Sequence, residues 1–261
     1  MKTVLVTGGT SGIGLCAAQA LQAAGYRVYT FSRRGTGPAG MTHLAVDVQN
    51  EAAVFRAVDR IMEQEAQLDL VIHCAGFGIS GAVEFTDTAD AQRLFDVNFF
   101  GAVRVNKAVI PHLRRSRGRI ILVSSVAAPV AIPFQTYYSC TKAALNDYAL
   151  ALANELRPFG VSVCAVMPGD IRTGFTAARK KTEAGDDLYG GRIRRSVSRM
   201  EQDEQSGMTP EQAGRFLCRI AQKCRIKPLY TIGFSYRCIC LLVKLLPAGL
   251  VNRLVGLLYA K

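Results

Sequence analysis

The sequence has little that would place it outside the ordinary globular proteins. It contains no Gly-X-Y period and no repeat of roughly 20–50 residues, which excludes collagen-like and solenoid architectures. Hydrophobic residues make up 49% of the 261 residues, far more than a disordered chain contains. No linker long enough to separate two halves is visible, so we expect a single domain over residues 1–261 with a sizeable core.

Paired cysteines are also missing. The eight cysteines are scattered and form no CxxC pair, whereas a secreted disulfide framework gathers them in a short, loop-rich chain. We expect reduced, mostly buried thiols in a cytoplasmic protein. No signal peptide is predicted, because Met1-Lys2-Thr3 leads directly into an apolar stretch. His73 and Cys74 predict no metal site, since neighbours on a strand point to opposite faces.

Acidic residues are in the minority. The 32 Lys and Arg residues against 20 Asp and Glu give a formal net charge of +12, which permits contact with nucleic acid or an anionic membrane. The basic residues are spread over helix-like surfaces without the interleaved aromatic side chains that a single-strand binder needs. We therefore expect no nucleic-acid partner.

Short apolar runs alternate with helical patterns through the first two thirds of the chain. Such alternation predicts an α/β fold, with one doubly wound (Rossmann-type) parallel sheet and helices on both faces. The expected strands cover residues 3–7, 27–31, 43–46, 68–73, 119–124 and 161–167. The expected helices cover residues 13–24, 51–65, 90–115 and 138–157.

Two segments depart from this alternation. Residues 174–207 are charged and rich in Arg, and we interpret them as a mobile insertion, rather than a packed element, that closes over a substrate as a lid. Residues 234–261 form an apolar tail of amphipathic helices, in which Lys244, Pro247 and Arg253 interrupt any transmembrane run. Packing on the core, pairing with another subunit and peripheral membrane contact remain open as roles of this tail.

The turn after the first strand is rich in glycine and reads Thr7-Gly8-Gly9-Thr10-Ser11-Gly12-Ile13-Gly14. Glycine lets a diphosphate approach the backbone, and the free N–H groups at the start of the next helix attract an anion. The turn therefore predicts dinucleotide contacts at Gly8, Thr10, Ser11, Gly12, Ile13 and Gly14. The spacing Thr-Gly-x-x-x-Gly-Ile-Gly resembles the cofactor motif of the short-chain dehydrogenase/reductase family.

The second strand ends in Ser32-Arg33-Arg34, with no Asp or Glu. A carboxylate at this position would bind both ribose hydroxyls of NAD, whereas a cation attracts the 2′-phosphate of NADP. We predict NADP(H), with Arg33 pairing the phosphate, Ser32 donating a hydrogen bond and Arg34 as a second cation. The family resemblance implies that Asp47, which precedes Val48, accepts a hydrogen bond from the adenine amine.

Tyr138 and Lys142 lie four residues apart, on one face of the expected helix. A neighbouring cation lowers the pKa of a phenol and fits it for proton transfer at neutral pH. The family resemblance implies a catalytic group made of Asn98, Ser125, Tyr138 and Lys142. In it, Ser125 would bond the substrate oxygen, Lys142 would also hold the nicotinamide ribose, and Asn98 would anchor a water that relays protons. Tyr137 and Ser124 are the neighbouring residues of the same types. We expect each to point to a different face of its helix or strand from Tyr138 and Ser125.

Two further motifs follow strands. Pro168-Gly169-Asp170-Ile171-Arg172-Thr173 is similar to the Pro-Gly-x-x-x-Thr motif of the family, which implies nicotinamide contacts from Pro168, Gly169, Ile171 and Thr173. His73-Cys74-Ala75-Gly76 stands where the family usually has Asn-Asn-Ala-Gly. Ala75 and Gly76 are retained as cofactor contacts, and the departure at the first two positions is expected to change local hydrogen bonding rather than chemistry.

Residues 130–135, with Met167 and Phe175, are expected to line an apolar substrate pocket. The pattern Pro-Phe-Gln…Tyr-Ser is similar to the hydroxysteroid and retinol branch of the family. We predict an NADP(H)-dependent oxidoreductase of lipophilic ketones or secondary alcohols. A 3-oxoacyl-thioester reductase and a non-catalytic NADP-binding regulator are the alternatives. The small apolar residues Ala143, Ala144, Leu150 and Ala151 favour a homodimer or homotetramer.

Overall fold

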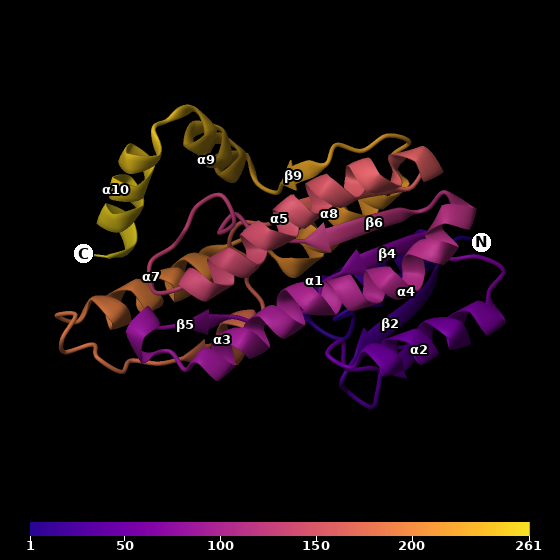
Figure 1. Ribbon diagram of the computed structural model, residues 1–261, viewed down its shortest axis with the longest axis horizontal. Helices are drawn as coiled ribbons and strands as arrows, with labels where there is room; N and C mark the ends of the chain where they lie inside the picture. Colours follow the sequence, from indigo (N-terminus) through magenta and orange to yellow (C-terminus); the bar gives the residue numbers. More distant parts are fainter. Residues whose placement is uncertain (261) are drawn as a thin grey trace.

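Seven parallel strands form the central sheet of the computed structural model, which describes residues 1–260 (Figure 1). Their order across the sheet is β3-β2-β1-β4-β6-β7-β9. These strands are β1 (Thr3–Thr7), β2 (Arg27–Ser32), β3 (Thr42–Ala45), β4 (Leu70–His73), β6 (Arg119–Val123), β7 (Ser162–Met167) and β9 (Leu229–Thr231). The strands β1, β4, β6 and β7 are buried along almost their whole length, because helices cover both faces of the sheet. The predicted α/β fold with a doubly wound parallel sheet is confirmed.

The strand order reverses beside β1. The chain moves outward from β1 to β2 and β3, and then returns to β4 on the other side of β1. Thr7 pairs with His73, so the carboxyl ends of β1 and β4 lie side by side. Open parallel sheets bind their ligands in the crevice at such a switch point. We therefore expect the functional loops to meet at this edge.

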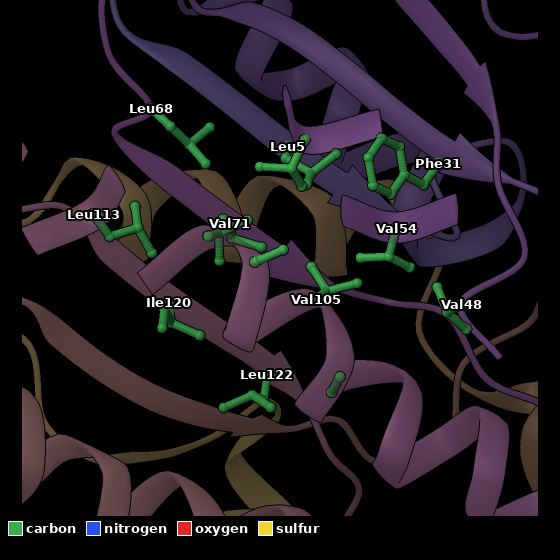
Figure 2. Close-up of a cluster of buried hydrophobic side chains, with 14 of the residues drawn as sticks. Leu5, Phe31, Val48, Val54, Leu68, Val71, Val105, Leu113, Ile120 and Leu122 are labelled. Atoms are coloured by element: carbon green, nitrogen blue, oxygen red, sulfur yellow. The ribbon is translucent and has the colours of Figure 1, made fainter. Parts of the chain in front are cut away.

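Helices cover the sheet on both faces. These helices are α1 (Gly12–Ala23), α2 (Glu51–Gln64), α4 (Gly101–Ser116), α5 (Thr136–Leu156) and α8 (Pro210–Gln222). On one face, Leu21 of α1 and Leu217 of α8 pack against Val4 and Val6 of β1. On the other face, α2, α4 and α5 cover a larger cluster of buried apolar side chains. Figure 2 shows this second cluster, in which Val54 and Val105 from the helices lie among side chains of the strands.

The helix predicted over residues 90–115 is interrupted. α3 (Thr88–Phe95) leads into a π-helical turn over Asp96–Phe100, and α4 follows directly. The amide of Gly101 donates to the carbonyl of Asp96, five residues earlier. Such turns are rare and are often found at functional sites. Here the turn carries Asn98, whose side chain is buried.

Residues 174–207 contain packed elements. The interpretation of this segment as an insertion rather than a packed element is therefore wrong. α6 (Phe175–Ala178) comes first, and β8 (Lys180–Lys181) then pairs with β5 (Ile79–Ser80). α7 (Arg192–Ser206) buries Ile193, Val197 and Met200 against Ala82. These three side chains recur at helical spacing within an Arg-rich sequence, so the charge obscured a short apolar stripe. That this lid segment, residues 174–207, closes over a substrate stays a proposal.

The C-terminal residues form the two amphipathic helices expected, α9 (Phe234–Leu245) and α10 (Ala248–Tyr259). Figure 1 shows both, in yellow, at the edge of the molecule beyond the layers that cover the sheet. Within residues 1–260, no helix is long and apolar enough to cross a membrane. The edge strand β9 was not expected, because its three residues are too few to show a pattern.

The eight cysteines are free, as expected. The expectation that most are buried is wrong. Cys164, Cys218 and Cys240 are buried, while Cys140, Cys224 and Cys238 are exposed. Two of the exposed thiols lie on the solvent-facing sides of α5 and α9, where an apolar sequence context does not imply burial.

Candidate active site

A cavity of about 340 Å³ opens at the carboxyl ends of β1, β4, β6 and β7. Its walls include the loops that directly follow these four strands, as the switch point predicts. Most of the predicted site residues line it: Gly8, Ser11, Gly12, Ile13, Gly14, Arg34, Ala75, Gly76, Ser125, Tyr138, Lys142, Pro168, Gly169, Ile171 and Thr173. Residues more than a hundred positions apart in the sequence are thus brought together.

The glycine turn is packed so tightly that neighbouring backbone atoms exclude a side chain at two of its positions. Gly8 has a φ of +66°, and a Cβ added there would lie 2.8 Å from the amide nitrogen of Ala75. A Cβ on Gly14 would lie 2.3 Å from the carbonyl oxygen of Gly8. The first glycine therefore brings β1 close to the loop after β4, and the second seats α1 against the turn.

The start of α1 offers unpaired backbone donors to the cavity. Ser11, the N-cap of α1, makes no side-chain capping bond, whereas the N-cap residues Asn50, Asp87 and Thr209 each cap their own helix. Ser11 and the first helical residues line the cavity instead. Backbone N–H groups at a helix start, aided by the helix dipole, bind a phosphate well. The residues present therefore fit the diphosphate of a dinucleotide.

Basic groups follow β2. The Arg34 guanidinium donates from Nη1 to the carbonyl oxygen of Thr10, 3.0 Å away, which holds the cation beside the glycine turn. The backbone carbonyl of Arg34 lies 2.8 Å from His43 Nε2, and Ser32 Oγ accepts from the Arg34 amide at 3.2 Å. Arg33 is exposed. This arrangement fits a ribose that carries an additional phosphate.

The loop after β3 lies next to that after β2, because the amide of Val46 donates to the carbonyl of Ser32. Asp47 Oδ1 accepts from the amide of Gln49 at 3.0 Å, while Val48 is buried against Gly101. Five predicted cofactor residues are not among those that line the cavity: Thr10, Ser32, Arg33, Asp47 and Val48.

Tyr138 and Lys142 project from consecutive turns of α5, and Ser125 follows β6. The Lys142 ammonium lies 5.4 Å from the centre of the Tyr138 ring and donates to the carbonyl oxygen of Val123 at 2.9 Å. The neighbouring Ser124 also lines the cavity, but its buried hydroxyl donates to the carbonyl oxygen of Lys142. A phenol, an ammonium and an alcohol are therefore grouped at one end of the cavity.

The protein environment raises the pKa of Tyr138, contrary to the expected lowering. Burial raises it to about 12 and outweighs the hydrogen bond with Ser125, which lowers it. Burial also lowers the pKa of Lys142 to about 8. At neutral pH the Tyr138 phenol is consequently protonated and can donate its proton.

Asn98 lies behind the cavity, on the π-helical turn. Its Oδ1 accepts from the amide of Phe77, and its Nδ2 donates to the carbonyl of Phe77, both at 3.0 Å. The same amide group donates to Thr141 Oγ1 at 3.3 Å. The side chain thus ties the loop after β4 to α5, next to Lys142.

His73, which stands where the family usually has Asn, takes part in a chain of hydrogen bonds. His73 Nε2 lies 2.8 Å from Asn106 Oδ1, and Asn106 Nδ2 donates to the Tyr148 hydroxyl at 3.2 Å. Burial lowers the pKa of His73 to about 4, so the ring is neutral and Nε2 carries the donated proton. The buried chain connects β4 to α4 and α5 below the cavity.

The apolar wall is smaller than predicted. Ile132, Gln135 and Phe175 line the cavity. Met167 is buried instead, and its sulfur accepts from Asn146 Nδ2. Phe134 packs edge-on against Tyr189 of the lid segment, with 5.6 Å between the ring centres.

Sequence reasoning missed two acidic residues of the cavity, Asp170 and Glu204. Glu204, on α7, forms an ion pair with the buried guanidinium of Arg179 and accepts from Thr176. The Arg179 guanidinium lies 5.6 Å from the Phe175 ring, which in turn lies 5.6 Å from that of Tyr138. Asp170 falls inside a motif already singled out and could have been noticed, whereas nothing in the sequence marks Glu204.

The chain is similar to known proteins over most of its length. The family model described as short chain dehydrogenase matches residues 2–184. The 3-ketodihydrosphingosine reductase of Bacteroides thetaiotaomicron is 38% identical, over 90% of this chain and 91% of its own. The NADPH-dependent 1-acyldihydroxyacetone phosphate reductase of Schizosaccharomyces pombe is 35% identical over 66% of this chain and 60% of its own. A crystal structure of a short-chain dehydrogenase from Streptomyces avermitilis superposes with a TM-score of 0.82 and 26% identity, covering 92% of this chain and 90% of that one.

Proposed function

Because the chain belongs to the short-chain dehydrogenase/reductase family of oxidoreductases, which act on CH–OH groups, we propose that it reduces a lipophilic ketone with NADPH. The observation that carries this proposal is the convergence of Tyr138, Ser125 and Lys142 on one cavity with the uncapped start of α1. A group able to donate a proton and a site able to hold a diphosphate are thereby joined in one space.

Each side chain has a distinct role in the reduction. Tyr138 donates the proton that the carbonyl oxygen takes up, and Ser125 bonds the same oxygen as its negative charge develops. Lys142 holds the nicotinamide ribose and returns a proton to Tyr138 after turnover. Asn98 anchors the water through which Lys142 exchanges protons with solvent. When bound, the reduced nicotinamide supplies the hydride to the carbonyl carbon.

NADPH is the proposed cofactor because cations, and no carboxylate, follow β2. Arg34 stands beside the glycine turn, and Arg33 and Ser32 lie next to it. A 2′-phosphate placed there gains two charge-assisted partners, whereas NAD gains none. Asp47 accepts from the adenine amine, Ile171 and Thr173 hold the carboxamide, and Pro168 and Gly169 contact the nicotinamide.

The substrate class is supported by the cavity and by the relatives. Ile132 and Phe175 give the cavity apolar walls near Tyr138, and two relatives are named for reducing ketones that carry long hydrocarbon chains. We therefore expect a ketone with a long apolar chain, with 3-ketodihydrosphingosine as the first compound to assay.

A homodimer or homotetramer that associates through α5 completes the proposal. Leu150 and Ala151 are exposed on this helix, and Ala143 and Ala144 are half-buried. Small apolar side chains on an exposed helix face allow close contact between two helices.

The experiment that tests the proposal follows NADPH oxidation with a panel of ketones and identifies the product. The panel contains 3-ketodihydrosphingosine, steroid ketones, retinal, short aliphatic ketones and 3-oxoacyl thioesters. Preferred turnover of a long-chain or polycyclic ketone supports the proposal, and preferred turnover of the thioesters supports the acyl-reductase alternative. NADPH binding without turnover of any compound would identify a non-catalytic regulator.

A further inference from the structure

The two C-terminal helices carry an unusual share of the exposed large hydrophobic side chains of residues 1–260. More than half of its exposed large hydrophobic side chains lie on α9 and α10: Phe234, Ile239, Leu241, Leu242, Leu245, Leu250, Leu254, Leu257 and Leu258. Leu245 is 71% exposed and Leu258 is 66% exposed. Contiguous apolar surface of this kind marks an interaction site in a folded protein.

The exposed side chains form one stripe on each helix. On α9, Leu241 and Leu245 lie one turn apart and are exposed, while Cys240 is buried. On α10, Leu250, Leu254 and Leu258 recur every four residues, while Val255 is buried. Each helix therefore turns one apolar face to the molecule and a second to its surroundings.

Basic side chains flank these stripes. Arg237 and Lys244 follow Phe234 and Leu241 by three residues on α9, and all four side chains are exposed. Arg253 is exposed beside the stripe of α10. Apolar stripes bordered by Arg or Lys are typical of helices that lie in the surface of an anionic membrane.

The net positive charge of the chain is concentrated in the C-terminal part of its sequence. The last 50 residues, 212–261, contain nine Lys and Arg and no Asp or Glu, so they carry +9 of the net +12. The first 211 residues are nearly balanced. α9 and α10 themselves carry Arg237, Lys244 and Arg253 and no acidic residue, so the same helices of a second copy would be repelled, whereas anionic lipid headgroups would be attracted.

Both helices contact segments that line the cavity. Tyr236 of α9 donates to the carboxylate of Asp170, and a Cβ on Gly169 would lie 2.1 Å from its ring. Tyr259 of α10 donates to Asp203 at 3.3 Å, next to Glu204 in the sequence. The apolar stripes are thus carried by helices that contact Asp170, which lines the cavity, and Asp203, which precedes Glu204 of the lining.

We propose that α9 and α10 dock onto the surface of an anionic membrane. Each helix has 12 residues and is about 18 Å long, too short to cross a hydrocarbon core of about 30 Å. The leucine stripes enter the boundary between headgroups and acyl chains, and Arg237, Lys244 and Arg253 bind the headgroups. A substrate dissolved in the membrane can then reach the cavity without crossing water.

Flotation of the full chain with lipid vesicles tests this proposal without any substrate. Vesicles of phosphatidylcholine are compared with vesicles that contain about one third phosphatidylglycerol, at low and high salt. We expect binding to the anionic vesicles that falls as salt rises. Leu241→Asp/Leu254→Asp should lower the partition coefficient at least about tenfold, and Arg237→Gln/Lys244→Gln/Arg253→Gln about a hundredfold.

Matched controls are Phe159→Asp, an exposed apolar side chain elsewhere, and Arg56→Gln/Arg60→Gln on α2, and these should bind like the unmodified chain. Thermal melting confirms that each variant is folded. The proposal is overturned if folded stripe variants bind as tightly as the unmodified chain. It is also overturned if the chain ignores vesicles and the stripe variants instead dissociate an oligomer in sedimentation velocity.

Discussion

Tyr138 is the residue on which the proposed chemistry depends. Its pKa of about 12 keeps the proton on the phenol through the neutral range, so reduction of a carbonyl does not require prior protonation of the site. Replacement of its hydroxyl removes the donor and leaves the ring in contact with Phe175.

Tyr138→Phe is expected to lower kcat for ketone reduction by about 10²–10⁴ while NADPH binding is retained, because general acid catalysis contributes on this scale. Steady-state kinetics and NADPH titration measure the two properties separately. Tyr137→Phe is the matched control and should retain activity. If Tyr138→Phe reduces ketones at an undiminished rate, the proton comes from another group.

Glycine is required at position 8 because the backbone there lies too close to the loop after β4 to leave room for a Cβ. Gly8→Ala adds a Cβ 2.8 Å from a backbone nitrogen at a φ of +66°. We therefore expect loss of NADPH binding. We also expect the free energy of unfolding to fall by more than the cost of placing alanine at a positive φ. Gly25→Ala is the control, since its φ is +84° but no atom lies within 4 Å of the added Cβ. Urea unfolding should show a cost of about 1 kcal/mol for Gly25→Ala and a larger one for Gly8→Ala. Equal losses of unfolding free energy in the two variants would mean that the contact between Gly8 and the loop after β4 is not tight.

His73 makes stability depend on acid pH. Its pKa is about 4 in the folded chain and 6.5 in the unfolded one, so the unfolded chain binds more protons between these values and stability falls as pH falls from 6.5 to 4. The full loss is about 3 kcal/mol. His73→Gln retains a donor toward Asn106 and cannot titrate, so it should flatten this part of the profile in urea unfolding. If the dependence of stability on pH is unchanged in His73→Gln, the fall in stability at acid pH comes from other groups.

At the scale of elements, α7 holds the lid segment in place. Ile193 is fully buried against Ala82, on the loop that leads from β5, so its removal should loosen the helix that carries Glu204. Ile193→Ala is expected to cost about 2–5 kcal/mol locally, to raise KM for the ketone more than it lowers kcat, and to speed proteolysis within residues 183–191.

Arg199→Ala is the control for α7, since Arg199 is exposed and its pairing with Asp203 on the helix surface contributes little. It should leave KM and proteolysis unchanged. If Ile193→Ala also leaves KM unchanged, the lid segment does not contact the substrate.

The elements differ in how far their sequences reveal them. β1, β4, β6 and β7 were predictable because strands covered on both faces are continuously apolar. The π-helical turn at Asn98 was not, because an added residue in a helix barely alters the apolar period. In α7 the apolar stripe is outnumbered by Arg, and in β9 three residues are too few to form a pattern.

At the scale of the whole molecule, the sheet order explains why the site could be predicted. Every motif singled out in the sequence follows a strand or lies on α5, and parallel strands bring their carboxyl ends to one edge. Contacts made across that edge by side chains without a motif could not be predicted. Glu204 and Arg179 meet only because α7 folds back over the cavity.

The most direct test of the account measures hydride and proton transfer together. NADPH deuterated at the transferable position is consumed with a long-chain ketone, and the alcohol is analysed by mass spectrometry. We predict one carbon-bound deuterium per alcohol formed, at a rate that falls by two or more orders of magnitude in Tyr138→Phe. An alcohol without deuterium, or equal rates for the two proteins, would contradict the account.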